Sequence, residues 1–224
     1  MKTTDFRWPF LIILAGVILI GNLAEPASLG LTSEWSDGTY RFAGGTAPWA
    51  LASSVVIGIL YSLLMVASSA KTLNPLPGIF QRWLAFWIDF VFAIMMVAPI
   101  FGVIPCIREW RRTGIFEWSF ERNFSAAGDG WVMALTFLLS FTGILVYWAF
   151  PLMHGRPSPG SSILGYQITV SDENPMTFRR AFLRTVVGIV AACAPYLAPF
   201  IKRDRKRRQF WLDAVFGTYA VRLK

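Results

Sequence analysis

Charged residues are scarce in this chain. Only 15% of its 224 residues are charged and 55% are hydrophobic, whereas a soluble domain carries roughly 25% charged residues. Five apolar stretches approach or exceed the roughly 17–25 residues that cross a bilayer. The composition therefore excludes a soluble globular enzyme and predicts a polytopic helical membrane protein.

The chain also has few residues that hold metals or perform catalysis. Its two cysteines, Cys106 and Cys193, form no Cys-X-X-Cys pair, and His154 is its only histidine. No nucleophile elbow, zinc-protease motif, P-loop or dinucleotide fingerprint is present. We therefore expect no disulfide framework, no metal site, no cofactor and no enzymatic activity.

The apolar stretches predict the fold class. A short basic start precedes the first stretch, as in a signal peptide, but residues 24–26 form a poor cleavage site, so we expect a retained anchor. A fifth stretch, 185–201, is interrupted by Pro195 and Pro199, which break a helix. Alternation at 166–170 predicts one short strand. The predicted class is all-α, with this fifth segment and four crossings at 8–23, 49–70, 83–104 and 131–153.

The basic residues predict the orientation. If the N-terminus is cytoplasmic and the fifth stretch re-enters or lies in the interface, 16 of the 21 Lys and Arg face the cytoplasm, as the positive-inside rule requires. A full fifth crossing would put 13 of the 21 outside. With five crossings and the N-terminus outside, 13 of the 21 Lys and Arg would face the cytoplasm, but so would the acidic loop 25–48. We favour four crossings with both termini cytoplasmic.

Asp89 is the one acid inside a predicted crossing. An uncompensated carboxylate there costs about 2.5–3.5 kcal/mol on insertion scales. Arg82, two helical turns earlier, and Arg184, at the start of the fifth stretch, are equally good partners. We favour a structural ion pair, and the alternative is a cation or proton site on a translocation path.

Four segments in order resemble the RDD family of membrane proteins. The segment 78–89 runs Gly-Ile-Phe-Gln-Arg-Trp-Leu-Ala-Phe-Trp-Ile-Asp and is similar to the family's opening motif. Segments 160–170, 178–184 and 212–221 resemble its later motifs, although Ser161 stands where a lysine is usual. The resemblance implies a multi-span bacterial membrane domain at about 75–224, after an N-terminal hairpin at 1–74. It also implies that Arg82, Asp89 and Asp213 are the name-giving residues.

Basic residues gather near the C-terminal end. A run of them predicts binding to anionic lipid headgroups rather than nucleic acid, because no aromatic residues interleave with it. Asp213 follows this run. It is either a surface counter-charge or, if the C-terminal segment folds back, an ion-pair partner of Arg82 or Arg184. The residues of the run are Lys202, Arg203, Arg205, Lys206, Arg207 and Arg208.

The loop 105–130 mixes aromatic and charged residues. This mixture favours an interfacial segment on the outer leaflet, with a protein docking surface as the alternative.

Two functions fit these features. We favour a non-catalytic scaffold or accessory subunit of a bacterial inner membrane, packed against a partner membrane protein or a second copy of itself. The alternative is a small oligomeric transporter or ion exchanger that uses Asp89, since a carboxylate next to a proline-broken segment is typical of transport sites.

Overall fold

The computed structural model of the chain describes residues 7–24, 32–36, 39–66, 71–72, 77–124, 130–170, 176–193 and 211–223. Its residues group into two compact units. One unit comprises Met1–Pro9, Leu60–Phe92 and Leu145–Lys224, and the other comprises Phe10–Ile59 and Ala93–Ile144.

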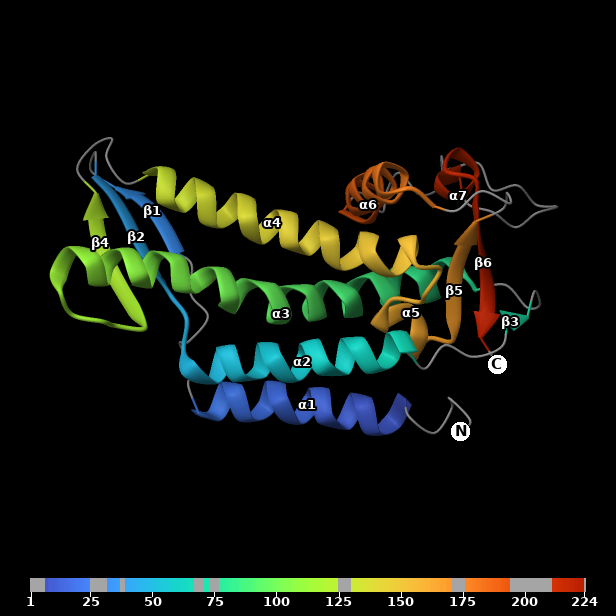
Figure 1. Cartoon of the computed structure of the whole chain (residues 1–224), viewed down its shortest axis with the longest axis horizontal. Coiled ribbons are helices and arrows are strands. Elements are labelled where there is room, and N and C mark those ends of the chain that lie inside the picture. Colours follow the sequence, from blue (N-terminus) through green and yellow to red (C-terminus); the bar gives the residue numbers. More distant parts are fainter. Residues whose placement is uncertain are drawn as a thin grey trace. The chain divides into compact units, whose positions relative to one another are not determined.

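Helices make up most of the described structure (Figure 1). Among the described residues, two apolar stretches are long enough to cross a membrane, Phe80–Thr113 and Gly130–Met153, and two shorter ones are Ile12–Gly21 and Pro48–Leu63. The mostly helical character is confirmed, while the number of four crossings stays a prediction. The helices are α1 (Arg7–Ala24), α2 (Pro48–Val66), α3 (Ile79–Thr113), α4 (Gly130–Met153), α5 (Pro159–Ile163), α6 (Phe178–Cys193) and α7 (Trp211–Val215).

Two three-stranded antiparallel sheets accompany the helices. One has the order β1-β2-β4 and the other β3-β6-β5. The strand predicted at 166–170 is confirmed as β5, but an all-α class misses the other strands, of which β1 and β2 form a local hairpin while β3, β4 and β6 pair with segments distant in sequence. The strands are β1 (Thr32–Ser36), β2 (Thr39–Gly45), β3 (Lys71–Thr72), β4 (Ser119–Phe124), β5 (Tyr166–Val170) and β6 (Thr218–Leu223). The boundary between 1–74 and 75–224 stays a prediction.

Helix α3 continues well past the end of the predicted crossing at residue 104. Its last turns carry an ion pair between Arg112 and Glu109, with 2.6 Å between Nη2 and Oε1. The helix ends at Gly114, whose φ of 76° suits glycine, and whose N–H donates to the carbonyl of Trp110 at 2.8 Å. Strand β4 then follows, so the segment 105–130 is not the continuous loop that we expected. Its contact with the outer leaflet stays a prediction.

Three prolines lie inside the spanning helices, Pro99, Pro105 and Pro151, and α2 supplies hydroxyls to the carbonyls that Pro99 and Pro151 leave free. Because proline has no N–H, Pro99 leaves the carbonyl of Met95 without its helical donor, and Pro151 does the same to Tyr147. The hydroxyl of Ser54 lies 2.9 Å from the carbonyl oxygen of Met95, and that of Tyr61 lies 2.9 Å from the carbonyl oxygen of Tyr147. These hydroxyls satisfy backbone groups that lipid could not.

The substitution Ser54→Ala tests this role. We expect it to lower the free energy of unfolding by about 1–2 kcal/mol, because it leaves a buried carbonyl without a donor. The measurement is the thermal midpoint of the purified chain in detergent. Ser53→Ala is the matched control, since Ser53 is also buried but bonds only the carbonyl of Ala50 within its own helix. Equal losses in both variants would contradict the assignment.

Candidate functional site

Asp213 lies between two arginines that are distant in sequence. Its Oδ1 accepts from Arg184 Nη2 at 2.8 Å, and its Oδ2 accepts from Arg82 Nη1. The hydroxyl of Thr218 lies 3.2 Å from Oδ1 of Asp213 and accepts from Arg184 Nε at 3.2 Å. We call these four residues the Asp213 cluster.

Four separate elements bring the Asp213 cluster together. Arg82 lies in the first turns of α3, Arg184 in the middle of α6 and Asp213 in the first turn of α7. Gly217, with a φ of 58°, turns the chain from α7 into β6, whose first residue is Thr218. Asp213 therefore pairs with both arginines, which confirms the fold-back and rejects the solvated counter-charge.

The cluster is almost completely buried. The side chain of Asp213 is 0% exposed, and those of Arg82 and Arg184 are 14% and 10% exposed. Burial alone would raise the pKa of Asp213, but the two guanidinium groups and their hydrogen bonds hold this pKa below its ordinary value. The carboxylate therefore stays charged and accepts from each arginine.

Asp89 does not pair with either arginine, so the expected ion pair is wrong. Its Oδ1 accepts from the backbone N–H of Gly160 at 2.7 Å and from the hydroxyl of Tyr147 at 3.1 Å. Its Oδ2 accepts from the hydroxyl of Ser158 at 2.6 Å. The residue is 3% exposed. The hydrogen bonds that reach Asp89 thus come from neutral donors, and we call these four residues the Asp89 network.

The local sequence explains why α5 reaches Asp89. Ser158 is the N-cap of α5 and Pro159 occupies its first turn, which is the usual order at a helix start. Gly160 permits the close approach to α3, because a Cβ at this position would lie 2.2 Å from the carbonyl oxygen of Ala85. Ser161 donates to the carbonyl of Ser158 at 2.9 Å. No side chain larger than hydrogen fits at residue 160.

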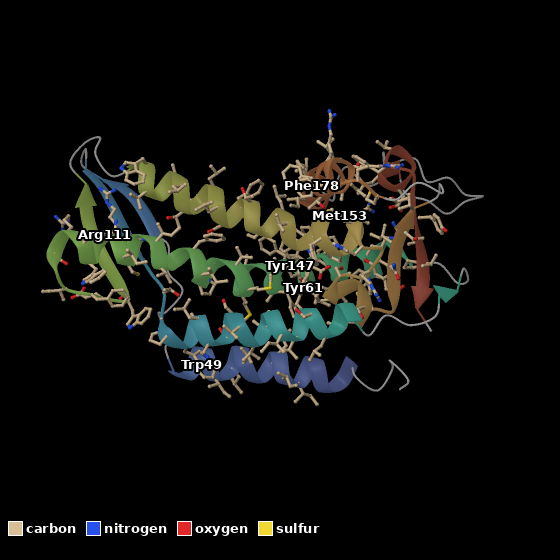
Figure 2. The ribbon with its side chains drawn as sticks, in the orientation of Figure 1. Trp49, Tyr61, Arg111, Tyr147, Met153 and Phe178 are labelled. Atoms are coloured by element: carbon tan, nitrogen blue, oxygen red, sulfur yellow. The ribbon has the colours of Figure 1, made fainter. Side chains whose placement is uncertain are left out.

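Tyr147 extends the Asp89 network to α2. The rings of Tyr147 and Tyr61 lie 4.9 Å apart between centroids, and Figure 2 shows the two side chains together between α2 and α4. Since Tyr61 also bonds the carbonyl of Tyr147, the network joins α2, α3, α4 and α5. The network therefore holds these helices together by hydrogen bonds around one buried carboxylate.

The sequence analysis missed several residues of these two groups. Ser158 and Gly160 belong to a Ser-Pro-Gly-Ser run, and this run is a helix-start signal that could have been recognised. Tyr147 lies four residues before Pro151, so a freed carbonyl was predictable there. Thr218 gave no comparable signal, because only the fold-back of β6 brings it to Arg184.

The remaining predicted residues lie apart from these groups or outside the described part of the chain. His154 is exposed, and its Nδ1 lies 2.8 Å from the carbonyl oxygen of Phe150. Among the described residues, no cluster of three His, Cys, Asp or Glu side chains could hold a metal ion. The basic residues at 202–208, together with Pro195 and Pro199, fall outside the described ranges.

The lowered pKa of Asp213 predicts a pH dependence. Its folded pKa lies below the unfolded value of about 3.9, so its contribution to stability is present above that value and is lost as the pH falls through the folded pKa. We expect the thermal midpoint of the wild type to exceed that of Asp213→Asn most at neutral pH, with the difference narrowing below about pH 4. Glu109→Gln, in the exposed Arg112 pair, is the control. A constant difference from pH 7 to pH 3 would contradict the argument.

One family of known proteins matches the sequence of the chain. The model of the RDD family matches residues 76–217, which includes Arg82, Asp89, Arg184 and Asp213. No curated protein and no solved structure matches the chain. The match covers more than half of the chain and confirms the resemblance noted in its sequence, and the chain therefore belongs to the RDD family of helical membrane proteins.

Proposed function

We propose that the chain is a non-catalytic scaffold or accessory subunit of a bacterial inner membrane. The proposal rests on the hydrogen bonding of the two buried carboxylates. Every carboxylate oxygen of Asp89 and Asp213 accepts from a group on another element. A site of this kind fixes the positions of helices and offers a substrate little free bonding capacity.

The membrane-facing surface fits a subunit that packs against other membrane components. Large apolar side chains are exposed along the spanning helices, and lipid or a partner helix would cover them. The partner that we propose is another membrane protein or a second copy of this chain, within a bilayer of anionic lipids. Nucleic acid is not a proposed partner. Examples of these exposed residues are Val55, Ile59, Phe80, Ile100, Phe137 and Leu138.

The proposed orientation places both termini in the cytoplasm. Arg82, Arg184 and Asp213 lie in one compact unit, and these residues belong to segments whose basic residues the positive-inside rule assigns to the cytoplasmic side. Four crossings with a fifth segment that does not cross satisfy this arrangement.

A small transporter or ion exchanger is the second candidate, and Asp89 is the observation that favours it. The hydrogen bonds to its carboxylate come from neutral groups, so a proton or a cation could neutralise its charge without displacing an arginine. Buried acids of spanning helices mark ion pathways in many membrane proteins.

Asp89→Asn separates the two candidates. The amide oxygen can accept from Tyr147 and Gly160, and the amide nitrogen faces the hydroxyl of Ser158. If Asp89 is structural, we expect a loss of about 1–2 kcal/mol in the free energy of unfolding, because one neutral hydrogen bond replaces a charge-assisted one. The measurement is the thermal midpoint in detergent. In parallel, proton and sodium flux is measured in liposomes that contain the wild type or the variant.

The scaffold proposal expects equal background flux in both preparations. Glu109→Gln makes the same chemical change outside the Asp89 network and should leave both the midpoint and the flux at wild-type values. A variant with the wild-type midpoint that abolishes a flux present in the wild type would reject the scaffold and support the transporter.

A further inference from the structure

Helix α6 has a buried face that attaches it to the rest of its compact unit. Ala181 is fully buried in an apolar cluster with Ala149, Leu152 and Met176. Arg184, one turn later, reaches Asp213. This face therefore carries both an apolar contact and the charged contact of the Asp213 cluster.

The opposite face of α6 is apolar and exposed. Leu183 is 45% exposed and Val190 is 63% exposed. These residues are seven apart, which places them on one side of the helix two turns from each other. A helix of a soluble protein would carry polar residues on that side.

The direction of α6 differs from that of the spanning helices. Figure 1 shows α6 nearly end-on, whereas α4 lies lengthwise in the same view. The part of α4 from Leu145 onward belongs to the same compact unit as α6. Helix α6 thus runs across the end of α4 and does not lie alongside it.

The charges on α6 point to a particular partner. Its sequence contains three arginines and no acidic residue. Arg184 is used by Asp213, while Arg179 is exposed at the start of the helix. An exposed cation beside an apolar face matches a surface that has acyl chains below and anionic headgroups above.

We propose that α6 lies in the plane of the membrane at the cytoplasmic surface and binds anionic lipid. Leu183 and Val190 enter the boundary between acyl chains and headgroups, and Arg179 reaches the lipid phosphates. The cytoplasmic side rests on the proposed orientation, and the rest of the inference depends only on the membrane character of the chain and holds for either proposed function.

The test measures the depth of the two outward residues. Leu183→Cys and Val190→Cys are made separately in the full chain, with Cys106 and Cys193 replaced by alanine. Each variant receives a fluorescent label and is placed in vesicles of phosphatidylglycerol and phosphatidylcholine. Lipids brominated at known depths then quench the label. Phe141→Cys, exposed near the middle of α4, serves as a deep control.

We expect both labels on α6 to be shallow and at equal depth, and the Phe141→Cys label to be deeper. A crossing orientation would separate the two α6 labels by up to about 10 Å, from seven residues at 1.5 Å each, and a separation of that size would overturn the proposal. Quenching by an aqueous reagent but not by lipid would assign the face to solvent or a soluble partner and would also overturn it. Protection from both quenchers, with energy transfer between labelled copies, would assign it to a second copy instead.

Discussion

The C-terminal part of the structure depends on the ion pairs that the buried Asp213 carboxylate makes with Arg82 and Arg184. A carboxylate without exposed surface needs donors that replace water, and here Arg82 and Arg184 approach its two oxygens from different helices. Both arginines are mostly buried, so each guanidinium group also needs an anion as its partner. One acid thus joins the start of α3, the middle of α6 and the turn before β6. Strand β6 then pairs with β5 and β3, so the carboxylate also positions the small sheet.

A second constraint is the demand that lipid places on the backbone. A spanning helix cannot leave carbonyls without donors in the hydrocarbon region, yet α3 contains Pro99 and α4 contains Pro151. Ser54 and Tyr61, which lie two turns apart on α2, donate hydrogen bonds to the carbonyls that these prolines leave free. The Asp89 network makes a related use of hydroxyl and backbone donors. The hydroxyls of Ser54 and Tyr61 and the Asp89 network therefore hold helices together, and this supports the scaffold that we propose.

The sequence predicted some of these features and not others, for physical reasons. Apolar length located α1 to α4, since hydrophobicity depends on composition alone. The alternation at 166–170 located β5, because Tyr166, Ile168 and Val170, at alternate positions of the strand, pack in or against apolar clusters. Asp89 was assigned the wrong partner, because a carboxylate in a crossing suggests an arginine, whereas the run from Ser158 to Gly160 supplies neutral donors through a helix start. The sheet of β1, β2 and β4 was missed, since β1 and β2 form a short local hairpin and β4 joins it only after α2 and α3 have intervened in the chain. Helix α6 starts earlier than the apolar stretch 185–201, because its first turns bury one face and expose Arg179 on another.

The most direct test of the central ion-pair cluster is a double-mutant cycle on Arg184 and Asp213. The free energy of unfolding is measured in detergent for the wild type, Arg184→Ala, Asp213→Ala and the double variant. Each single change leaves a buried charge with fewer partners, so each should cost about 3–5 kcal/mol. The double variant should cost less than the sum of the two by about 1–3 kcal/mol. The exposed pair of Glu109 and Arg112 provides the matched cycle and should show a much smaller coupling. Strict additivity at Arg184 and Asp213 would contradict the account, because the two side chains would then not depend on each other.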